Sequence, residues 1–208
     1  MRLTVTTFLT LDGVYQAPGG PEEDPSGGFE HGGWSFPFAD ADQGRIIGDV
    51  FARADAFLLG RRTYDIFASF WPTAGDEEEP VASKLNSLPK YVVSTTISEP
   101  AWRGTSVIRG NVAQEVAALK ARPGNELQVH GSGRLVQTLM ADGLVDEFRL
   151  LIYPVVLGTG RRLFERPGQA AGLRLVDCTT TSTGVVVATY APDGPVRHGS
   201  FAGEQGQP

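Results

Sequence analysis

The 208-residue sequence is long enough for one domain with its own core, and 41% hydrophobic and 20% charged residues are ordinary for a globular protein. A net charge of −6 argues against a general nucleic-acid binder, although a local basic pocket is compatible with it. The only cysteine, Cys178, excludes an intramolecular disulfide and a cysteine metal cluster. Without a signal-peptide pattern or an apolar run of membrane-spanning length, we expect a cytoplasmic protein with no membrane or nucleic-acid partner.

The first half of the chain alternates strand and helix signals. Residues 3–11, rich in Thr, Val, Phe and Leu, predict a strand. Residues 17–33, rich in Gly and Pro, predict a long loop, and such loops are often functional lids. A helix over residues 43–53, a strand over 56–59 and a helix over 63–70 follow, the last ending before Pro72. Residues 76–79 predict an acidic loop, and residues 81–87 a short helix.

In the second half, strands are predicted over residues 91–94, 106–108, 127–130 and 145–153. Helices are predicted from a cap at Asn111 to about residue 121, and over 135–140. Residues 173–178 and 184–190 predict a closing antiparallel pair. We therefore expect one α/β domain over residues 1–191, with a mostly parallel sheet covered on both faces, and a flexible tail over 192–208.

The most informative motif is Gly60-Arg61-Arg62-Thr63, which lies between a predicted strand and a predicted helix. Gly60 lets the backbone approach a ligand closely, and the start of the helix offers free N–H groups to phosphate oxygens. The guanidinium groups of Arg61 and Arg62 match phosphate geometry. The motif therefore indicates an anion site, although a surface turn with two solvated arginines is the plain alternative.

Two further polar turns follow predicted strands. Ser94, Thr95 and Thr96 end a strand in three hydroxyls that could hold a ribose phosphate, although a plain strand end is the alternative. Gly131-Ser132-Gly133 could cradle a pyrophosphate with backbone N–H groups, or form an ordinary turn between strand and helix. The carboxyl ends of parallel strands meet at one sheet edge, so the three turns should converge. We interpret His130 as a packed strand residue. The three histidines lack metal-ligand spacing, so no metal is expected, and a hydrolase built on Ser132 is poorly supported because no nucleophile elbow is present.

Several motifs in this order resemble the dihydrofolate reductase-like superfamily. The similarity is greatest to the reductase domain of the riboflavin-biosynthesis deaminase-reductase family. The motifs that carry the resemblance are Thr10-Leu11-Asp12-Gly13, Gly32-Gly33-Trp34, Leu58-Leu59-Gly60-Arg61-Arg62-Thr63-Tyr64, Lys90-Tyr91-Val92-Val93-Ser94, His130-Gly131-Ser132-Gly133-Arg134-Leu135 and Asp146-Glu147-Phe148-Arg149-Leu150, with residues 153–164 continuing the match.

The resemblance implies a three-layer α/β/α fold that binds NADPH. It implies that Arg61 faces the adenosine 2′-phosphate, with Arg62 nearby, and that Thr63 faces the pyrophosphate. The segment up to Trp34 would be a lid or substrate wall. The other implied cofactor-binding residues are Leu11, Asp12 and Gly13 at the nicotinamide, Gly60 at the phosphate turn, Ser94 and Thr95 near the 2′-phosphate, and Gly131, Ser132, Gly133, Arg134 and Leu135 at the glycine turn.

These observations predict an NADPH-dependent reductase that transfers a hydride to a small heterocyclic or carbonyl/imine substrate, pyrimidine- or pterin-like. The alternative is a non-catalytic, dimeric nucleotide-binding protein. Asp42 is the candidate proton donor, with Asp40 as a second candidate that also faces the substrate; water and helix capping are competing readings. The resemblance implies a homodimer, for which residues 185–187 could supply an interface or simply pack in the core.

Overall fold

A computed structural model describes residues 1–75, 80–164 and 170–200. The predicted acidic loop at residues 76–79 and the last part of the predicted tail, residues 201–208, lie outside the described residues. None of the helices within the described ranges is both long and apolar enough to cross a membrane.

An eight-stranded sheet forms the middle layer of the described chain. Its strands are β1 (Arg2–Thr10), β2 (Ala54–Gly60), β3 (Lys90–Val93), β4 (Thr105–Ile108), β5 (Glu126–His130), β6 (Glu147–Tyr153), β7 (Leu173–Thr180) and β8 (Val186–Pro192). They are ordered β4-β3-β2-β5-β1-β6-β8-β7. Strands β1 to β6 pair in parallel, whereas β8 is antiparallel to β6 and to β7. The predicted mixed sheet with an antiparallel C-terminal edge is therefore confirmed.

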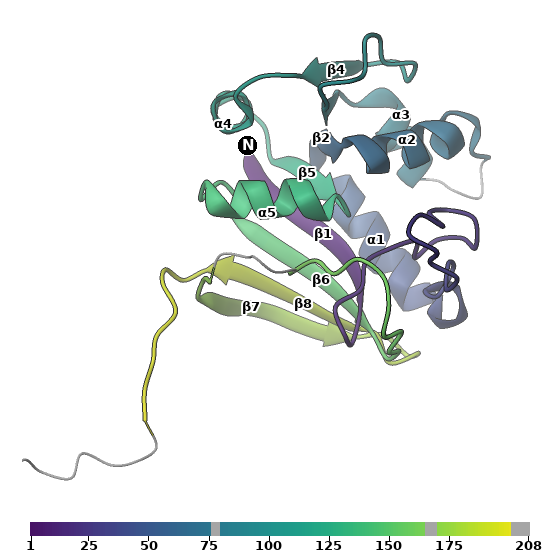
Figure 1. The fold of residues 1–208 in the computed structure, drawn as a ribbon, viewed down its shortest axis with the longest axis vertical. Helices are drawn as coiled ribbons and strands as arrows, with labels where there is room; N and C mark the ends of the chain where they lie inside the picture. Colours follow the sequence, from purple (N-terminus) through teal and green to yellow (C-terminus); the bar gives the residue numbers. More distant parts are fainter. Residues whose placement is uncertain (76–79, 165–169, 201–208) are drawn as a thin grey trace, which may run out of the picture.

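Helices cover both faces of this sheet (Figure 1). They are α1 (Ala41–Ala52), α2 (Arg61–Phe70), α3 (Val81–Ser87), α4 (Val112–Lys120) and α5 (Gly133–Ala141), with short 3₁₀ turns at Phe36–Phe38 and Trp71–Thr73. One core cluster joins α4 and α5 to the central strands, and a second joins α1, α2 and α3 to β2 and β3. The three-layer α/β/α architecture of the dihydrofolate reductase-like fold is confirmed.

Local sequence signals explain where several helices begin. Asp40 caps α1 by accepting a 2.7 Å hydrogen bond from the backbone N–H of Gln43, so the helix starts two residues before the predicted position. Asn111 caps α4 as predicted, accepting from the backbone N–H of Gln114. Helix α2 ends at Phe70 because Pro72 cannot continue it.

The order of the strands brings the three polar turns together. Strands β3, β2 and β5 are neighbours and run in the same direction, so Ser94, Gly60 and Gly131 follow strands at one edge of the sheet. The expected convergence of the turns at the carboxyl ends is confirmed by this topology.

The two C-terminal strands, β7 and β8, differ in burial. Val185 and Val187 are buried in a core cluster with Tyr153, which agrees with the core-packing reading of residues 185–187. The last strand in the order, β7, is exposed along its whole length, including the apolar side chains of Leu175 and Val176.

Candidate functional site

A cavity of about 1440 Å³ opens at the carboxyl edge of the sheet. Single small-molecule pockets usually enclose about 300–1,000 Å³, so this cavity has room for a dinucleotide and a second molecule. Its walls come from the end of β1, the segment after it, the inner face of α1, the starts of α2 and α5, and the last residue of β5. The lining includes Thr6, Phe8, Tyr15, Glu23, Asp24, Gln43, Gly44, Phe51, residues 60–63, Thr96, residues 130–135 and Arg161.

Two helix N-termini face this cavity without a side-chain cap. Gly60 precedes α2 and Ser132 precedes α5, and in neither case does a side chain accept a hydrogen bond from the first turn. By contrast, α1 and α4 are capped by Asp40 and Asn111. The free N–H groups and the positive end of each helix dipole make such termini receptive to anions. Both of the predicted glycine turns therefore have the chemistry expected of a phosphate site.

The two turns are tied to each other by hydrogen bonds. Gly60 N donates to Ser132 Oγ at 3.0 Å, and Ser132 N donates to Thr63 Oγ1 at 3.2 Å. Ser132 has a φ of 54°, an uncommon value for a residue other than glycine, and Gly131 before it has the same value. Strained backbone of this kind often occurs at ligand sites, where the surrounding contacts hold it in place. Thr63 thus contributes to the rigidity of the paired turns.

Arg61 points toward the hydroxyl cluster that follows β3. Its Nε donates to Asp65 Oδ2 at 2.7 Å, and its Nη1 donates to Thr96 Oγ1 at 2.7 Å. Thr96 lines the cavity, whereas Ser94 and Thr95 do not. Ser94 instead accepts hydrogen bonds from the backbone N–H groups that follow it, and it stabilises the turn that presents Thr96.

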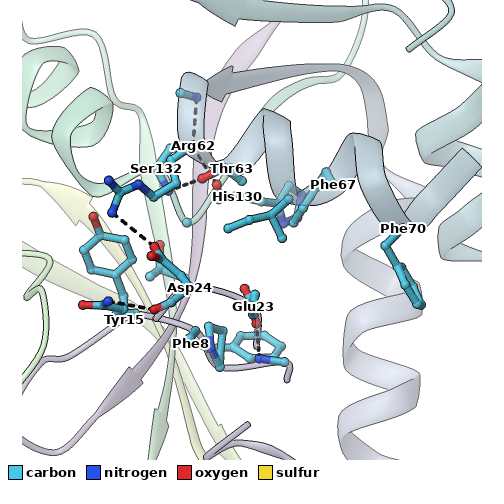
Figure 2. A pocket seen from close by; sticks show the side chains of 18 of the residues that line it. Phe8, Tyr15, Glu23, Asp24, Arg62, Thr63, Phe67, Phe70, His130 and Ser132 are labelled. Atoms are coloured by element: carbon cyan, nitrogen blue, oxygen red, sulfur yellow. Dashed lines mark hydrogen bonds and ion pairs between the residues drawn. The ribbon is translucent and has the colours of Figure 1, made fainter. Parts of the chain in front are cut away.

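Arg62 is turned toward the long segment after β1 (Figure 2). Its Nη1 donates to Ser26 Oγ at 2.7 Å and to Asp24 Oδ2 at 3.3 Å. Arg161 also forms an ion pair with Asp24 and donates to Ser26 at 2.8 Å. Burial alone would raise the pKa of Asp24, but the Ser26 hydrogen bond and both arginines hold it below its usual range. Arg62 therefore fastens this wall to the start of α2.

Residues 17–24 and Ser26 line the cavity, in agreement with the predicted loop wall. Within this wall Glu23 accepts hydrogen bonds from the backbone N–H groups of Gly19 and Gly20 through Oε2. Burial raises the pKa of Glu23, an effect that the two N–H groups oppose and Asp24 reinforces. Among the carboxyl groups of the described lining, Glu23 is the one with a raised pKa.

Leu11, Asp12 and Gly13 follow β1 but do not line the cavity. Asp12 binds the backbone N–H groups of Leu157 and Gly158 and pairs with Arg162 at 3.0 Å. Desolvation would raise the pKa of Asp12, but Thr10 and these donors lower it far below its usual range. Tyr15 reaches the site instead, and its ring lies over Gly133.

The structure does not bring the predicted catalytic and substrate residues into the cavity. Asp42 forms a loose pair with Arg45, and Asp40 accepts from Gln43, Ser182 and Thr183, which lowers the pKa of Asp40 to about 2. Trp34 is 7% exposed and packs edge-on against Tyr153 in the core. None of the three lines the pocket. The capping reading of Asp40 is the one the geometry supports.

Arg134 and Leu135 line the cavity on the first turn of α5. Thr96, the last of the three predicted hydroxyls, lines the cavity, and so does Glu23, which lies in the predicted loop wall. Tyr15, His130 and Arg161 also line it, although no motif predicted them as site residues. His130 directly precedes the predicted glycine turn, so its position in the sequence was the available signal. Arg161 and Tyr15 reach the pocket only through contacts between segments far apart in sequence.

This fold and this pocket define a protein of the dihydrofolate reductase-like superfamily. The model of the RibD C-terminal domain family matches residues 2–187, and the chain belongs to that family. The uncharacterized protein YyaP of Bacillus subtilis is 33% identical over 191 residues, covering 91% of this chain and 94% of YyaP. Another uncharacterized B. subtilis protein, YwjB, is 26% identical over 127 residues, covering 61% of this chain and 68% of YwjB.

Solved structures with low sequence identity share the fold. A Shewanella sp. PV-4 protein assigned to riboflavin biosynthesis is 22% identical with a TM-score of 0.66, covering 93% of this chain and 99% of that one. A pyrimidine reductase-like protein of Corynebacterium diphtheriae is 15% identical with a TM-score of 0.60, and the match covers 95% of this chain and 92% of that one. Dihydrofolate reductase of Enterococcus faecalis, complexed with NADP(H), is 12% identical with a TM-score of 0.59, and the match covers 92% of this chain and 96% of that one.

Proposed function

We propose that the protein is an NADPH-dependent reductase of the riboflavin-pathway type, which transfers a hydride to a small heterocyclic or carbonyl/imine substrate. The observation that carries this proposal is the pair of uncapped helix N-termini that face one cavity beside Arg61. The family membership and the NADP(H) complex of the related dihydrofolate reductase support it.

The residues of the pocket fit a dinucleotide with an extra phosphate. The N–H groups at the starts of α2 and α5 would hold the pyrophosphate, with Thr63 fixing the distance between the turns. Arg61 and Thr96 would hold the 2′-phosphate, since the guanidinium already lies at the hydroxyl. NADPH would supply the hydride, and the protein would align it with the substrate.

Reduction also needs a proton, for which we propose Glu23. Arg62 and Arg161 pair with Asp24, and Arg61 pairs with Asp65, whereas the described residues place no arginine or lysine against Glu23, whose pKa is raised by burial. Glu23 lines the cavity, and its Oε2 is held by hydrogen bonds from two backbone N–H groups. General acid catalysis contributes roughly 10²–10⁴-fold, so Glu23→Gln should lower kcat by about a hundredfold or more without weakening NADPH binding.

Fluorescence titration of the purified protein with NADPH and NADH tests the cofactor assignment. A charge-assisted hydrogen bond contributes about 1.5–3 kcal/mol, so Arg61→Ala should weaken NADPH binding about tenfold or more and leave NADH nearly unaffected. Arg45→Ala, an exposed arginine on α1 outside the pocket, is the matched control. Failure to bind either nucleotide would overturn the proposal, and equal affinity for both would remove the role of Arg61. Turnover with a panel of pterins, flavins and aminopyrimidines separates an enzyme from a non-catalytic binder.

A further inference from the structure

The cavity extends away from the anion turns, along the last two turns of α2. Phe67, Phe70 and Trp71 line it there, and Figure 2 shows Phe67 and Phe70 projecting from α2 among the lining side chains. At a rise of about 1.5 Å per residue, these two phenylalanines lie about 9 and about 14 Å along the helix from Arg61. We call this part the α1–α2 compartment. The other residues that line it are Gly44, Ile47 and Gly48 of α1, Ile66 of α2, and Pro80 and Val81 at the start of α3.

Three aromatic rings of this compartment form one cluster. The ring of Trp71 meets Phe67 edge-on with centroids 6.1 Å apart, and it meets Phe70 edge-on at 5.1 Å. Asn86 of α3 donates to the backbone oxygen of Trp71 at 2.8 Å, which holds this end of the cluster in place. Phe70 is nevertheless 50% exposed. An aromatic group of a ligand would remove this surface from water and would extend the edge-to-face arrangement.

The α1 side of the compartment has open space. Gly44 and Gly48 are four residues apart and therefore lie on the same face of the helix. A Cβ atom added at Gly44 would meet no protein atom within 4 Å, and one added at Gly48 would meet only Pro80 Cγ, at 4.0 Å. Ile47 adds apolar surface between them. The helix backbone thus leaves room for a flat apolar group beside the aromatic rings.

The cations of the described lining lie elsewhere, near the anion turns and the loop wall. They are the guanidinium groups of Arg61, Arg62, Arg134 and Arg161. The lining residues of α1 carry no charge, and beyond the first turn of α2 the charged lining residue is Asp65, a carboxylate. Arg45, the arginine of α1, lies outside the lining and pairs with Asp42 and Asp49. A phosphate group in the α1–α2 compartment would therefore lose water without gaining a cation.

We propose that the α1–α2 compartment holds an aromatic substituent of the substrate, and that the substrate carries no phosphate at this end. The inference rests on the proposed function, because the group held here would belong to the molecule that accepts the hydride from a cofactor at the anion turns. The compartment can nevertheless be tested by binding alone, without turnover.

The probes are 2-naphthol, a neutral aromatic compound, and ribose 5-phosphate, a phosphorylated sugar. Nitrogen–proton NMR of the full chain labelled in tryptophan gives one indole signal each for Trp34, Trp71 and Trp102, and Trp71→Phe assigns the signal of Trp71. We expect 2-naphthol to shift the Trp71 signal with a Kd in the millimolar range or tighter. The signal of Trp34, which packs against Tyr153 in the core, should stay in place. No shift of Trp71 with 2-naphthol, or a shift with ribose 5-phosphate, would overturn the proposal.

Variants locate the binding of 2-naphthol on the two walls. Phe70→Ala removes a half-exposed ring of the aromatic cluster, so it should weaken binding about tenfold. Gly48→Leu fills the open space on α1 and should abolish binding. Asp49→Leu is the matched control, because it adds the same side chain at an exposed neighbour outside the lining, and it should leave the Kd unchanged. Equal binding by the wild type and Gly48→Leu would place 2-naphthol elsewhere and overturn the proposal.

Titration with NADPH separates this inference from the proposed function. Saturating NADPH should leave the Kd of 2-naphthol nearly unchanged, because the two ligands occupy different parts of the cavity, and displacement would overturn the inference. If 2-naphthol binds as expected but NADPH does not, the proposed function fails while the ligand class of the compartment stands. If NADPH binds but ribose 5-phosphate takes the place of 2-naphthol at Trp71, the inference fails and the proposed function stands.

Discussion

The contact between Tyr15 and Gly133 makes a prediction whose size can be worked from the structure. A Cβ atom added at Gly133 would lie 2.6 Å from Tyr15 Cε1 and Cζ and 2.7 Å from its hydroxyl oxygen. Ordinary contacts of a Cβ atom begin near 3.4 Å, so the ring would have to move. Overpacking usually costs about 1–3 kcal/mol. Alanine is a better helix former than glycine by up to about 1 kcal/mol, which offsets part of this cost.

We therefore expect Gly133→Ala to lower the free energy of unfolding by about 2 kcal/mol, measured by urea denaturation. Two of the three close atoms are ring carbons, so Tyr15→Phe should retain the cost and Tyr15→Ala should remove it. The coupling in the double-mutant cycle should be about 1–3 kcal/mol. Gly60→Ala is the matched control, because its new Cβ would lie 3.4 Å from Ser132 Cβ, an ordinary contact.

Additive effects of Gly133→Ala and Tyr15→Ala would refute this reasoning, because they would mean that the ring does not lie over the glycine. An equal loss of unfolding free energy in the Gly60→Ala control would refute it as well, since any side chain added at the turns would then have the same effect. A changed urea dependence with an unchanged midpoint would point to the denatured state instead.

Three other predictions concern the walls of the pocket. Gly44→Ala adds a methyl group that meets no protein atom within 4 Å and that lies in the lining of the cavity. It should raise the free energy of unfolding by about 0.5–1 kcal/mol, because alanine is the better helix former, and lower kcat/KM by filling the pocket. A loss of stability would contradict this. Asp24→Asn should lower the free energy of unfolding by about 2 kcal/mol in urea denaturation, because Arg62 and Arg161 lose a buried partner. Asp65→Asn, in an exposed pair with Arg61, should lower it by less than about 1 kcal/mol. Equal losses would mean that Asp24 does not hold the loop wall to α2. His130 has a folded pKa of about 4 against 6.5 when unfolded, so the unfolded chain gains the proton first as pH falls through that window. The wild type should then lose about 1.4 kcal/mol per pH unit relative to His130→Phe, and parallel pH curves would refute this.

The sequence was sufficient for the fold because its signals are local. Periodicity located the strands and helices, Asn111 set the start of α4, and Pro72 set the end of α2. The parallel direction of most strands then followed from their alternation with helices, whereas their order in the sheet was not predicted. The positions of the anion turns were predictable for the same reason, since each turn directly follows a strand.

The walls of the pocket could not be predicted in this way. Arg62 turns toward Asp24, 38 positions away, and Arg161 reaches the same carboxylate across 137 positions. Two arginines next to a glycine turn are equally good candidates for phosphate contacts. Only tertiary packing decides that Arg62 binds the distant Asp24, whereas Arg61 binds Asp65 of its own helix and Thr96. Likewise, Asp42 and Glu23 are both acidic residues in segments that follow β1, but the fold leaves the first outside the cavity and places the second in its lining.

Strand β7 has a consequence for how the protein behaves in solution. Among the described strands none pairs with the outer edge of β7, so its backbone groups can pair with a strand of another molecule, beside its exposed leucine and valine side chains. Protein concentration then becomes an experimental variable: self-association through this edge would raise the apparent melting temperature as the sample is concentrated. Dilution series with light scattering would show whether the expected homodimer forms at the concentrations used for activity assays.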